Sequence, residues 1–166
     1  MKSFQAEKQI YFAAPLFNDM ERSFNLAVVK KIERNFSVFL PQRDGYLLRE
    51  LVASGISLER ARTMVYENDL MAIRSCKLVV AILDGRTIDE GVAVELGFAK
   101  GLGKVCLALK TDDRAMLPGG DNPMVMCSCD KIFSSIEDLV EGVSLFFLRL
   151  NCLGEEFGVS KRITQL

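Results

Sequence analysis

A glutamate stands in an unusual place in this sequence. Glu95 lies in a helical pattern that begins directly after a continuous apolar strand pattern, within residues 82–99. Its neighbours Val94, Leu96 and Phe98 are apolar, and an unpaired carboxylate in such surroundings costs several kcal/mol. A glutamate in an amphipathic helix is most often solvated. One among apolar side chains is usually paired, protonated or turned toward a cleft where it takes part in chemistry. We therefore treat Glu95 as a candidate nucleophile.

The composition restricts which other groups can take part. The sequence contains no histidine, which removes Ser-His and Cys-His nucleophile pairs, imidazole metal ligands and histidine general bases. Catalysis must therefore rest on carboxylates, tyrosines, lysines or thiols. The five cysteines are odd in number and lie mostly in apolar segments, which indicates free thiols in a reducing, cytoplasmic compartment. Cys127 and Cys129 lack CxxC spacing and a nearby histidine, so we expect no metal and no cofactor.

Charge and length limit the partners and the number of domains. The net charge of −1 and the pI near 5.6 give no basic stripe, so neither nucleic acid nor an anionic membrane is an expected partner. The polar start of the chain and the short apolar run after it predict neither a signal peptide nor a membrane span. In 166 residues we expect one domain at 9–150, with a polar N-terminal arm at 1–8 and a C-terminal tail of unassigned role at 151–166.

Short apolar runs alternate with longer helical patterns along the chain. Thr87 and Glu90 form a capping-box signature, which predicts that the helix carrying Glu95 begins near Ile88. The alternation predicts a single-domain α/β fold: an open, parallel, five-stranded sheet of flavodoxin-like or Rossmann-like type, with helices on both faces and strand order 2-1-3-4-5. The expected strands are 9–14, 37–40, 77–83, 104–109 and 125–129; the other expected helices are 18–35, 46–54, 58–75 and 135–150; the expected loops include 41–45 and 110–123.

This strand order opens a crevice beyond the carboxyl ends of the first and third strands. It brings Tyr11, Asp84, Asp89 and Glu95 toward one pocket. The loops there contain neither GxGxxG nor GxxxxGK[ST], which argues against dinucleotide and nucleoside triphosphate enzymes. A pocket of carboxylates suits cleavage of a glycosidic bond, because a nearby anion stabilises the oxocarbenium-like transition state and the leaving group needs a proton.

Four segments share their order and spacing with one enzyme family. Residues 11–17 (YFAAPLF) lie on the first strand and residues 67–73 (ENDLMAI) on the helix before the third strand. Residues 89–97 (DEGVAVELG) carry Glu95, and residues 122–124 (NPM) lie in the late loop. In this combination the sequence resembles the nucleoside 2-deoxyribosyltransferases over residues 10–132.

The resemblance implies a retaining double displacement at the anomeric carbon of a 2′-deoxyribonucleoside. Glu95 corresponds to the nucleophile, which holds the deoxyribosyl group as an ester until a second purine or pyrimidine base takes it back. Asp69 and Asp89 correspond to carboxylates that bind base and sugar and handle the proton on the ring nitrogen, and Tyr11 to a hydroxyl that steadies the nucleophile. The other positions implied to bind substrate are Phe12, Phe17, Gln42, Asp44, Gly91, Asn122 and Met124.

The resemblance also implies an oligomer. Asn122 and Met124 correspond to residues that a neighbouring subunit supplies, so we expect a homodimer or larger homo-oligomer with shared active sites. The family often places an amide after the second strand, and the sequence leaves open whether Gln42 or Asp44 takes that place. The base preference is likewise open.

Two other functions are compatible with these residues. A hydrolase on the same scaffold would let water resolve the Glu95 ester; a nucleotide hydrolase would also need a phosphate ligand, for which Arg43, Arg86 or Arg114 are available. A non-catalytic nucleotide-sensing domain would not require both Glu95 and Asp89. We favour the transferase, acting in nucleotide salvage and deoxyribonucleoside breakdown.

Overall fold

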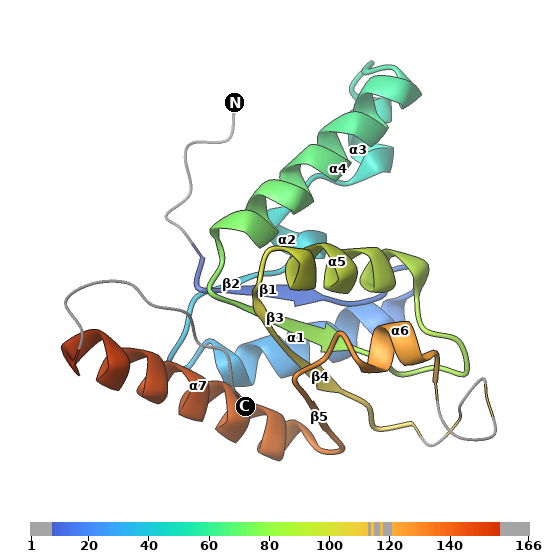
Figure 1. The fold of residues 1–166 in the computed structure, drawn as a ribbon. Helices are drawn as coiled ribbons and strands as arrows, with labels where there is room; N and C mark the ends of the chain where they lie inside the picture. Colours follow the sequence, from blue (N-terminus) through green and yellow to red (C-terminus); the bar gives the residue numbers. More distant parts are fainter. Residues whose placement is uncertain (1–7, 113, 115–116, 118–120, 157–166) are drawn as a thin grey trace.

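Five parallel strands form a single sheet at the centre of the computed structural model, which describes residues 8–112, 114, 117 and 121–156 (Figure 1). The strand order is β2-β1-β3-β4-β5, and every pairing is parallel. The predicted α/β class and strand order are therefore confirmed. The strands are β1 (Ile10–Ala13), β2 (Val38–Phe39), β3 (Leu78–Ile82), β4 (Val105–Leu109) and β5 (Lys131–Phe133).

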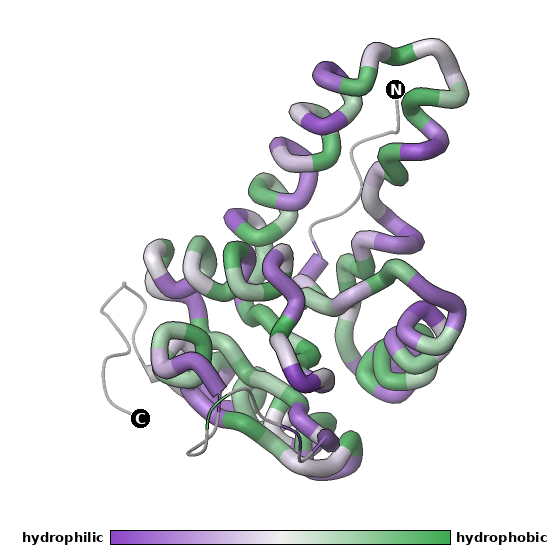
Figure 2. Tube along the Cα trace, turned by 90° about the vertical axis from the view of Figure 1, so that its right-hand side faces the viewer, coloured by the Kyte–Doolittle hydropathy of each residue, from purple (hydrophilic) through white to green (hydrophobic). Residues whose placement is uncertain are grey.

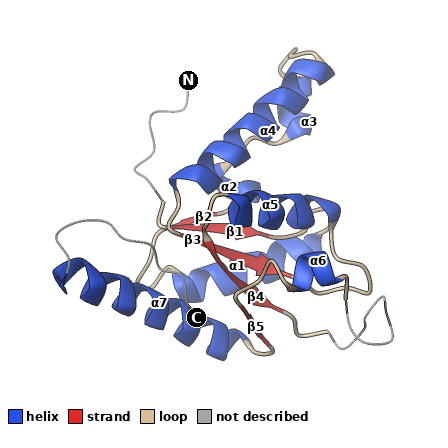
Figure 3. Ribbon diagram, viewed as in Figure 1, coloured by secondary structure: helices blue, strands red, loops and turns tan. Residues whose placement is uncertain are grey.

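Helices cover both faces of the sheet (Figure 3). On one face pack α1 (Asp19–Ile32) and α7 (Ile136–Glu156). The other face is covered by α5 (Glu90–Gly101), by α6 (Pro123–Met126) and by the C-terminal end of α4 (Leu58–Ser75). The sheet is thus the middle layer of three, as expected for parallel strands that are apolar on both sides.

The pleat of β1 divides its side chains between these two faces. Ile10 and Phe12 pack with α1 and α7, whereas Tyr11 and Ala13 lie on the face under α5. All four are fully buried. Because side chains alternate along a strand, Tyr11 is directed at the helix that carries Glu95.

Two helices form an arm that stands away from the sheet, as both views show (Figures 1 and 2). They are α3 (Leu48–Ala53) and α4, joined at Gly55, whose φ of 93° lies in the left-handed region that favours glycine. Ile73, near the end of α4, reaches the core, while Val52 and Leu58 on the outer part are exposed. A pair of helices has no core of its own, so the arm depends on its junction with the sheet layer.

The helix carrying Glu95 begins two residues later than predicted, because a different residue caps it. Asp89, rather than Thr87, is the N-cap of α5: its side chain accepts a hydrogen bond from the backbone N–H of Val92 at 2.9 Å. Aspartate is a better N-cap than threonine, and its charge also suits the positive end of the helix dipole. The buried side of α5 is an apolar stripe with helical spacing, formed by Val92, Leu96 and Ala99.

The predicted fifth strand is wrong in position. Residues 125–129 fall in α6 and the turn after it, and the fifth strand is β5 instead. Asn122 caps α6 by accepting a hydrogen bond from the N–H of Met124 at 2.9 Å, and Pro123 suits the first helical position. These two residues start a short helix where the apolar run alone indicated a strand.

Two other predicted boundaries also shift. Residues 41–45 do not form a plain loop, because Pro41 begins the short helix α2 (Pro41–Asp44). The last helix, α7, continues to Glu156, so the predicted tail at 151–166 begins inside a helix. Residues 157–166 of that tail and residues 1–7 of the predicted N-terminal arm lie outside the described residues.

Gly142 gives a direct test of how α7 packs on the sheet. A Cβ atom at this position would lie 2.2 Å from Cζ of the buried Phe133. We expect Gly142→Ala to lower the free energy of unfolding by about 1–3 kcal/mol, because the core must shift to admit the methyl group. Urea unfolding followed by circular dichroism measures this change.

The matched control is Gly97→Ala in α5, where a Cβ atom meets nothing within 4 Å. Alanine there is expected to raise the free energy of unfolding by about 0.5–1 kcal/mol, the ordinary helix preference over glycine. Equal effects of the two substitutions would contradict the close approach of α7 to β5.

Candidate active site

The hydroxyl of Tyr11 donates a hydrogen bond to Oε1 of Glu95 at 2.5 Å. The two residues come from β1 and α5 and are 84 positions apart in the sequence. The ring of Tyr11 stacks on that of Phe39, with the centroids 5.6 Å apart, which fixes the direction of the hydroxyl. The fold thus holds a buried donor against the candidate nucleophile.

Burial dominates the ionisation of this pair. It raises the pKa of Glu95 to about 8; the hydrogen bond from Tyr11 opposes the rise, and the charges of Asp69 and Asp89 add to it. Burial and the charge of Glu95 also raise the pKa of Tyr11 far above its ordinary value, so its hydroxyl stays a donor. Glu95 therefore exchanges its proton near neutral pH, the range in which enzyme acids and bases work.

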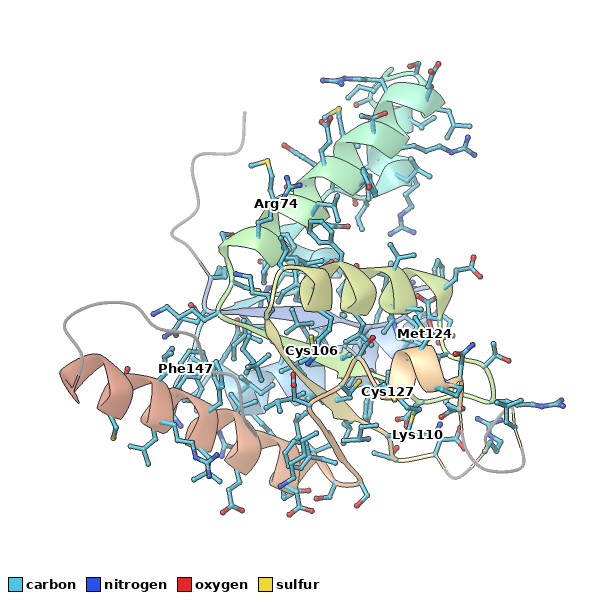
Figure 4. The ribbon with its side chains drawn as sticks, viewed as in Figure 1. Arg74, Cys106, Lys110, Met124, Cys127 and Phe147 are labelled. Carbon is cyan, nitrogen blue, oxygen red and sulfur yellow. The ribbon has the colours of Figure 1, made fainter. Side chains whose placement is uncertain are left out.

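Glu95 opens onto a cleft of about 520 Å³ between the arm and α5. Near the base of the arm, the guanidinium of Arg74 lies 5.3 Å from the ring centroid of Phe98, which joins α4 to α5 (Figure 4). Asp69 and Glu95 are among the lining residues nearest this junction, where α4 and α5 converge (Figure 1), and we call this the narrow end of the cleft. The arm supplies Leu48, Arg62, Val65, Tyr66, Asp69 and Leu70, and α5 supplies Glu90, Gly91, Val94 and Glu95. A cavity of this size is typical of a small-molecule site.

Asp69 is the second carboxylate at the narrow end. Burial raises its pKa to about 6, against the effect of a 3.3 Å hydrogen bond from Nδ2 of Asn68. Its charge acts on both Glu95 and Tyr11. Two carboxyl groups with raised pKa values, one from each wall, can hold and move a proton across the cleft.

Asp89 takes part through its charge rather than through an open position in the cleft. Its carboxylate caps α5, and from there it raises the pKa of Glu95. Gly91 does line the cleft, and a Cβ atom on it would lie 3.0 Å from Oδ1 of Asp89. A glycine here therefore leaves room for the cap and exposes the backbone of α5 to a ligand.

Several residues predicted to bind substrate do not line this cleft. Phe12 is fully buried on the opposite face of the sheet, because strand side chains alternate. Phe17 lies in the loop after β1 with 74% of its surface exposed. Asp84 does not join the carboxylate cluster either: it accepts hydrogen bonds from the N–H groups of Thr111 and Asp112, which ties the loops after β3 and β4 together.

Gln42 and Asp44 serve the loop after β2. The side-chain amide of Gln42 accepts from Asn25 at 3.0 Å and donates to the carbonyl of Arg22 at 3.0 Å. Asp44 accepts from the N–H of Leu40 at 2.9 Å. Gln42 therefore fixes the loop on α1 and Asp44 closes the turn, and neither is among the residues that line the cleft.

Asn122 and Met124 lie on α6, outside the cleft of their own chain. Both are exposed, Met124 by 79%, and Figure 4 shows Met124 on α6 with Lys110 at the end of β4. Lys110 forms an ion pair with the buried Asp121 at 3.1 Å, which holds the start of α6 close to β4. Asn122 and Met124 are exposed and do not line the cleft, so they are available to another molecule.

Sequence reasoning missed most of the cleft's lining. Tyr66 and Val94 are 59% and 61% exposed despite their size, and they line the cleft together with Arg62, Val65 and Leu70. The spacing of the α4 residues, at 62, 65, 66, 69 and 70, is that of one helix face and was a usable signal once Asp69 had been singled out. The sequence did not show that this face meets α5 instead of the sheet.

Metal and membrane features are absent from the part of the chain that the structure describes. No group of three acidic or cysteine side chains there is placed to hold a metal ion. No described helix is long and apolar enough to cross a membrane. The five cysteines are free, as predicted.

Comparisons with known proteins place the chain in a family. Residues 10–161 match the sequence profile of the family described as nucleoside 2-deoxyribosyltransferase. No curated protein sequence matches the chain. A conserved protein from Enterococcus faecalis V583 has a similar solved structure, with 28% identity, a TM-score of 0.68 and coverage of 84% of this chain and 99% of that one.

Two solved 2-deoxyribosyltransferases are also similar. The one from Bacillus psychrosaccharolyticus shares 26% identity with a TM-score of 0.62, over 79% of this chain and 89% of that one. The one from Leishmania mexicana, at 24% identity and a TM-score of 0.56 over 81% of this chain and 97% of that one, shares the fold. Since the family profile covers nearly the whole chain, this protein belongs to the nucleoside 2-deoxyribosyltransferase family.

Proposed function

We propose that this protein transfers the 2-deoxyribosyl group between nucleobases of 2′-deoxyribonucleosides, with Glu95 as the nucleophile. Membership of the family and likeness to a solved 2-deoxyribosyltransferase support a glycosyl-transferring enzyme. The observation that carries the proposal is the hydrogen bond from Tyr11 to Glu95 at the narrow end of a cleft that also holds Asp69. This arrangement offers an anion for an oxocarbenium-like transition state and an acid for the leaving base.

The two walls of the cleft suit the two halves of a nucleoside. The arm wall is largely apolar, with Leu48, Val65, Tyr66 and Leu70, and so suits the flat face of a base. The α5 wall offers Glu90 and the backbone at Gly91 to sugar hydroxyls. A nucleoside bound in this way has its glycosidic bond between Asp69 on one wall and Glu95 on the other.

In the first half-reaction, ionised Glu95 attacks C1′ and forms an ester as the bond from C1′ to the base nitrogen breaks. The electron pair of that bond goes to the base, which takes a proton from Asp69. Burial raises the pKa of Asp69 to about 6 and that of Glu95 to about 8, so near neutral pH the empty site holds one proton mainly on Glu95, and this proton must pass to Asp69 before the attack. The hydrogen bond from Tyr11 stabilises the state in which Glu95 is the ionised partner.

In the second half-reaction, an incoming base gives its proton to Asp69 and attacks C1′. The bond from C1′ to Glu95 breaks, and its electron pair returns to the carboxylate. Two inversions at C1′ retain the configuration, and the two steps predict ping-pong kinetics. No metal or cofactor is needed for this chemistry. Such exchange would serve the salvage and breakdown of deoxyribonucleosides in the cytoplasm.

Hydrolysis is the alternative outcome of the same ester, since water can take the place of the second base. A side chain that could bind the 5′-phosphate of a nucleotide substrate is less well supported. Arg43 forms ion pairs with Glu33 and Asp44, and Arg114 forms one with Asp112. Neither these two arginines nor Arg86 lines the cleft. A sensing domain would have no use for a buried carboxylate with a raised pKa.

The active site is proposed to be shared between subunits of a homodimer or larger homo-oligomer. Asn122 and Met124 are exposed on α6 and do not line their own cleft. A residue that serves a neighbouring subunit has to be placed in this way. The chain is 49% hydrophobic, which supports a sizeable apolar interface.

Removal of the nucleophile is the first test. Glu95→Ala is expected to lower the rate of transfer from deoxyinosine to adenine by a factor of roughly ten thousand or more, because the covalent route is lost. Liquid chromatography of deoxyadenosine, hypoxanthine and free deoxyribose follows transfer and hydrolysis together. With a 2-fluoro-2-deoxy nucleoside, wild-type protein is expected to carry a mass adduct on the peptide that contains Glu95.

A change in stability serves as the fold control. The pKa of Glu95 is raised in the folded protein, so its contribution to stability is full below about pH 4.5 and is lost as pH rises through about 8. Glu95→Gln removes this loss and should therefore gain thermal stability relative to wild type between pH 5 and pH 9. A folded Glu95 variant with wild-type turnover would rule out the mechanism.

Tyr11→Phe tests the hydrogen bond to the nucleophile. Without this donor the pKa of Glu95 rises further, because the hydroxyl opposes the effect of burial. The ascending limb of kcat against pH is then expected to move to higher pH by about 1–2 units, the equivalent of one hydrogen bond to a charged group. Steady-state rates from pH 5 to 10 measure it; an equal loss at every pH would mean that the hydroxyl does not control Glu95 ionisation.

Sharing between subunits is tested by mixing two inactive variants. Glu95→Ala and Asn122→Ala are each expected to impair every site of their own oligomer. After subunit exchange, mixed dimers have one site with both lesions and one intact site, so activity should return to at most about a quarter of wild type. Exchange confirmed by mass spectrometry without any recovery would mean that Asn122 serves its own subunit or none.

A further inference from the structure

One basic side chain lines the cleft. Arg62 lies on α4 seven residues before Asp69, so the two share one helix face and stand about 10 Å apart along the helix axis. The other ionisable lining groups, Asp69, Glu90 and Glu95, are acidic, with Tyr66 the single phenol. The cleft therefore changes from acidic at its narrow end to basic further out along the arm.

The guanidinium of Arg62 is available to a ligand. Within residues 8–112, 114, 117 and 121–156, no hydrogen bond or ion pair engages it. Arg22 and Arg43, by contrast, are held by carboxylates on their own part of the surface. An arginine without a partner, placed in a cleft, is well suited to recognise a planar group that accepts hydrogen bonds.

The orientation of the substrate decides what Arg62 meets. The base lies on the apolar arm wall, with its glycosidic nitrogen toward Asp69 and Glu95, if the proposed function holds. The edge of the base remote from the sugar then points out along α4 toward Arg62. In purines this edge carries the group that distinguishes hypoxanthine and guanine, with a carbonyl oxygen, from adenine, with an amino group.

We propose that Arg62 is a specificity-determining residue that selects 6-oxopurines over 6-aminopurines, an inference that rests on the proposed function. A guanidinium has only donors, so it pairs with a carbonyl oxygen. Opposite the amino group of a 6-aminopurine, the guanidinium would place one hydrogen-bond donor against another. Neither donor would then replace the hydrogen bond that it gave up to water. Hypoxanthine and adenine have nearly the same shape and differ at C6 and in the proton on N1, so a donor placed against the C6 substituent favours hypoxanthine.

Besides the carbonyl oxygen of a base, an arginine in the cleft could bind a phosphate group on the sugar. The geometry disfavours it, because the sugar lies along the α5 wall, where the carboxyl groups of Glu90 and Glu95 line the cleft. A phosphate placed there would meet like charges before it met Arg62. Donors with and without a 5′-phosphate distinguish a base carbonyl from a sugar phosphate as the group that Arg62 binds.

The test compares hypoxanthine and adenine as acceptors with thymidine as the common donor. Arg62→Ala is expected to lower the ratio of kcat/KM for hypoxanthine to that for adenine by about 5- to 150-fold, the discrimination of one good side-chain pair with a base edge. Arg62→Gln, whose amide both donates and accepts, should move the ratio further toward adenine. Arg60→Ala is the matched control, an exposed arginine of the same helix that does not line the cleft and should leave the ratio unchanged.

Calorimetric binding of the two free bases gives a second readout that does not need turnover. If wild type transfers deoxyribose but the ratio is the same in Arg62→Ala, the inference is overturned and the proposed function stands. If wild type cleaves neither thymidine nor deoxyinosine, the proposed function fails, and the binding ratio still decides the role of Arg62. A loss in Arg62→Ala confined to deoxynucleoside 5′-monophosphate donors would assign Arg62 to phosphate and overturn the inference. A wild-type protein that neither binds a base nor cleaves either donor would overturn both.

Discussion

A carboxylate that is taken out of water must be hydrogen-bonded or protonated, and the site of this protein depends on how Glu95 meets that constraint. Burial raises its pKa to about 8, and the Tyr11 hydroxyl holds it from rising further. A carboxylate left without that donor would keep its proton to a still higher pH. One with more donors would ionise at lower pH and hold its charge more firmly. The hydrogen bond from Tyr11 keeps the pKa of Glu95 between these limits.

The fold supplies that one bond through ordinary features of an α/β layer. The pleat of β1 directs Tyr11 at α5 and sends its neighbour Phe12 to the opposite face. The Asp89 cap fixes where α5 begins, and therefore which of its residues faces the cleft. A shift of one residue in either element would turn the donor or the acceptor away. Placement of the two groups thus follows from strand register and helix capping, both set by local sequence.

This explains which parts of the site the sequence could reveal. Strand order follows from hydrophobic periodicity and is confirmed. Tyr11, Asp69 and Glu95 lie in motifs on regular elements, and the structure brings them close to one another. The errors arose where competing local signals were close in strength: Thr87 against Asp89 as a cap, and an apolar run at 125–129 that Asn122 and Pro123 turn into a helix. Phe12, implied by the resemblance to bind substrate, lies on the opposite face from Glu95 because side chains alternate along β1. The apolar wall was missed because helix periodicity does not say what a helix face meets.

The structure separates chemistry from recognition. Tyr11 and Glu95 belong to elements packed in the sheet layer, where close packing holds distances within narrow limits. Arg62, Tyr66 and Leu48 belong to the arm, which stands away from the sheet and exposes much of its apolar surface. The arm meets the sheet layer near Arg74 and Ile73, so changes on the arm wall leave the buried pair in place. The exposed apolar wall costs stability while it faces water, and a ligand that covered it would offset part of that cost. Recognition on such an element is therefore coupled to its stability, whereas the reaction depends on the sheet.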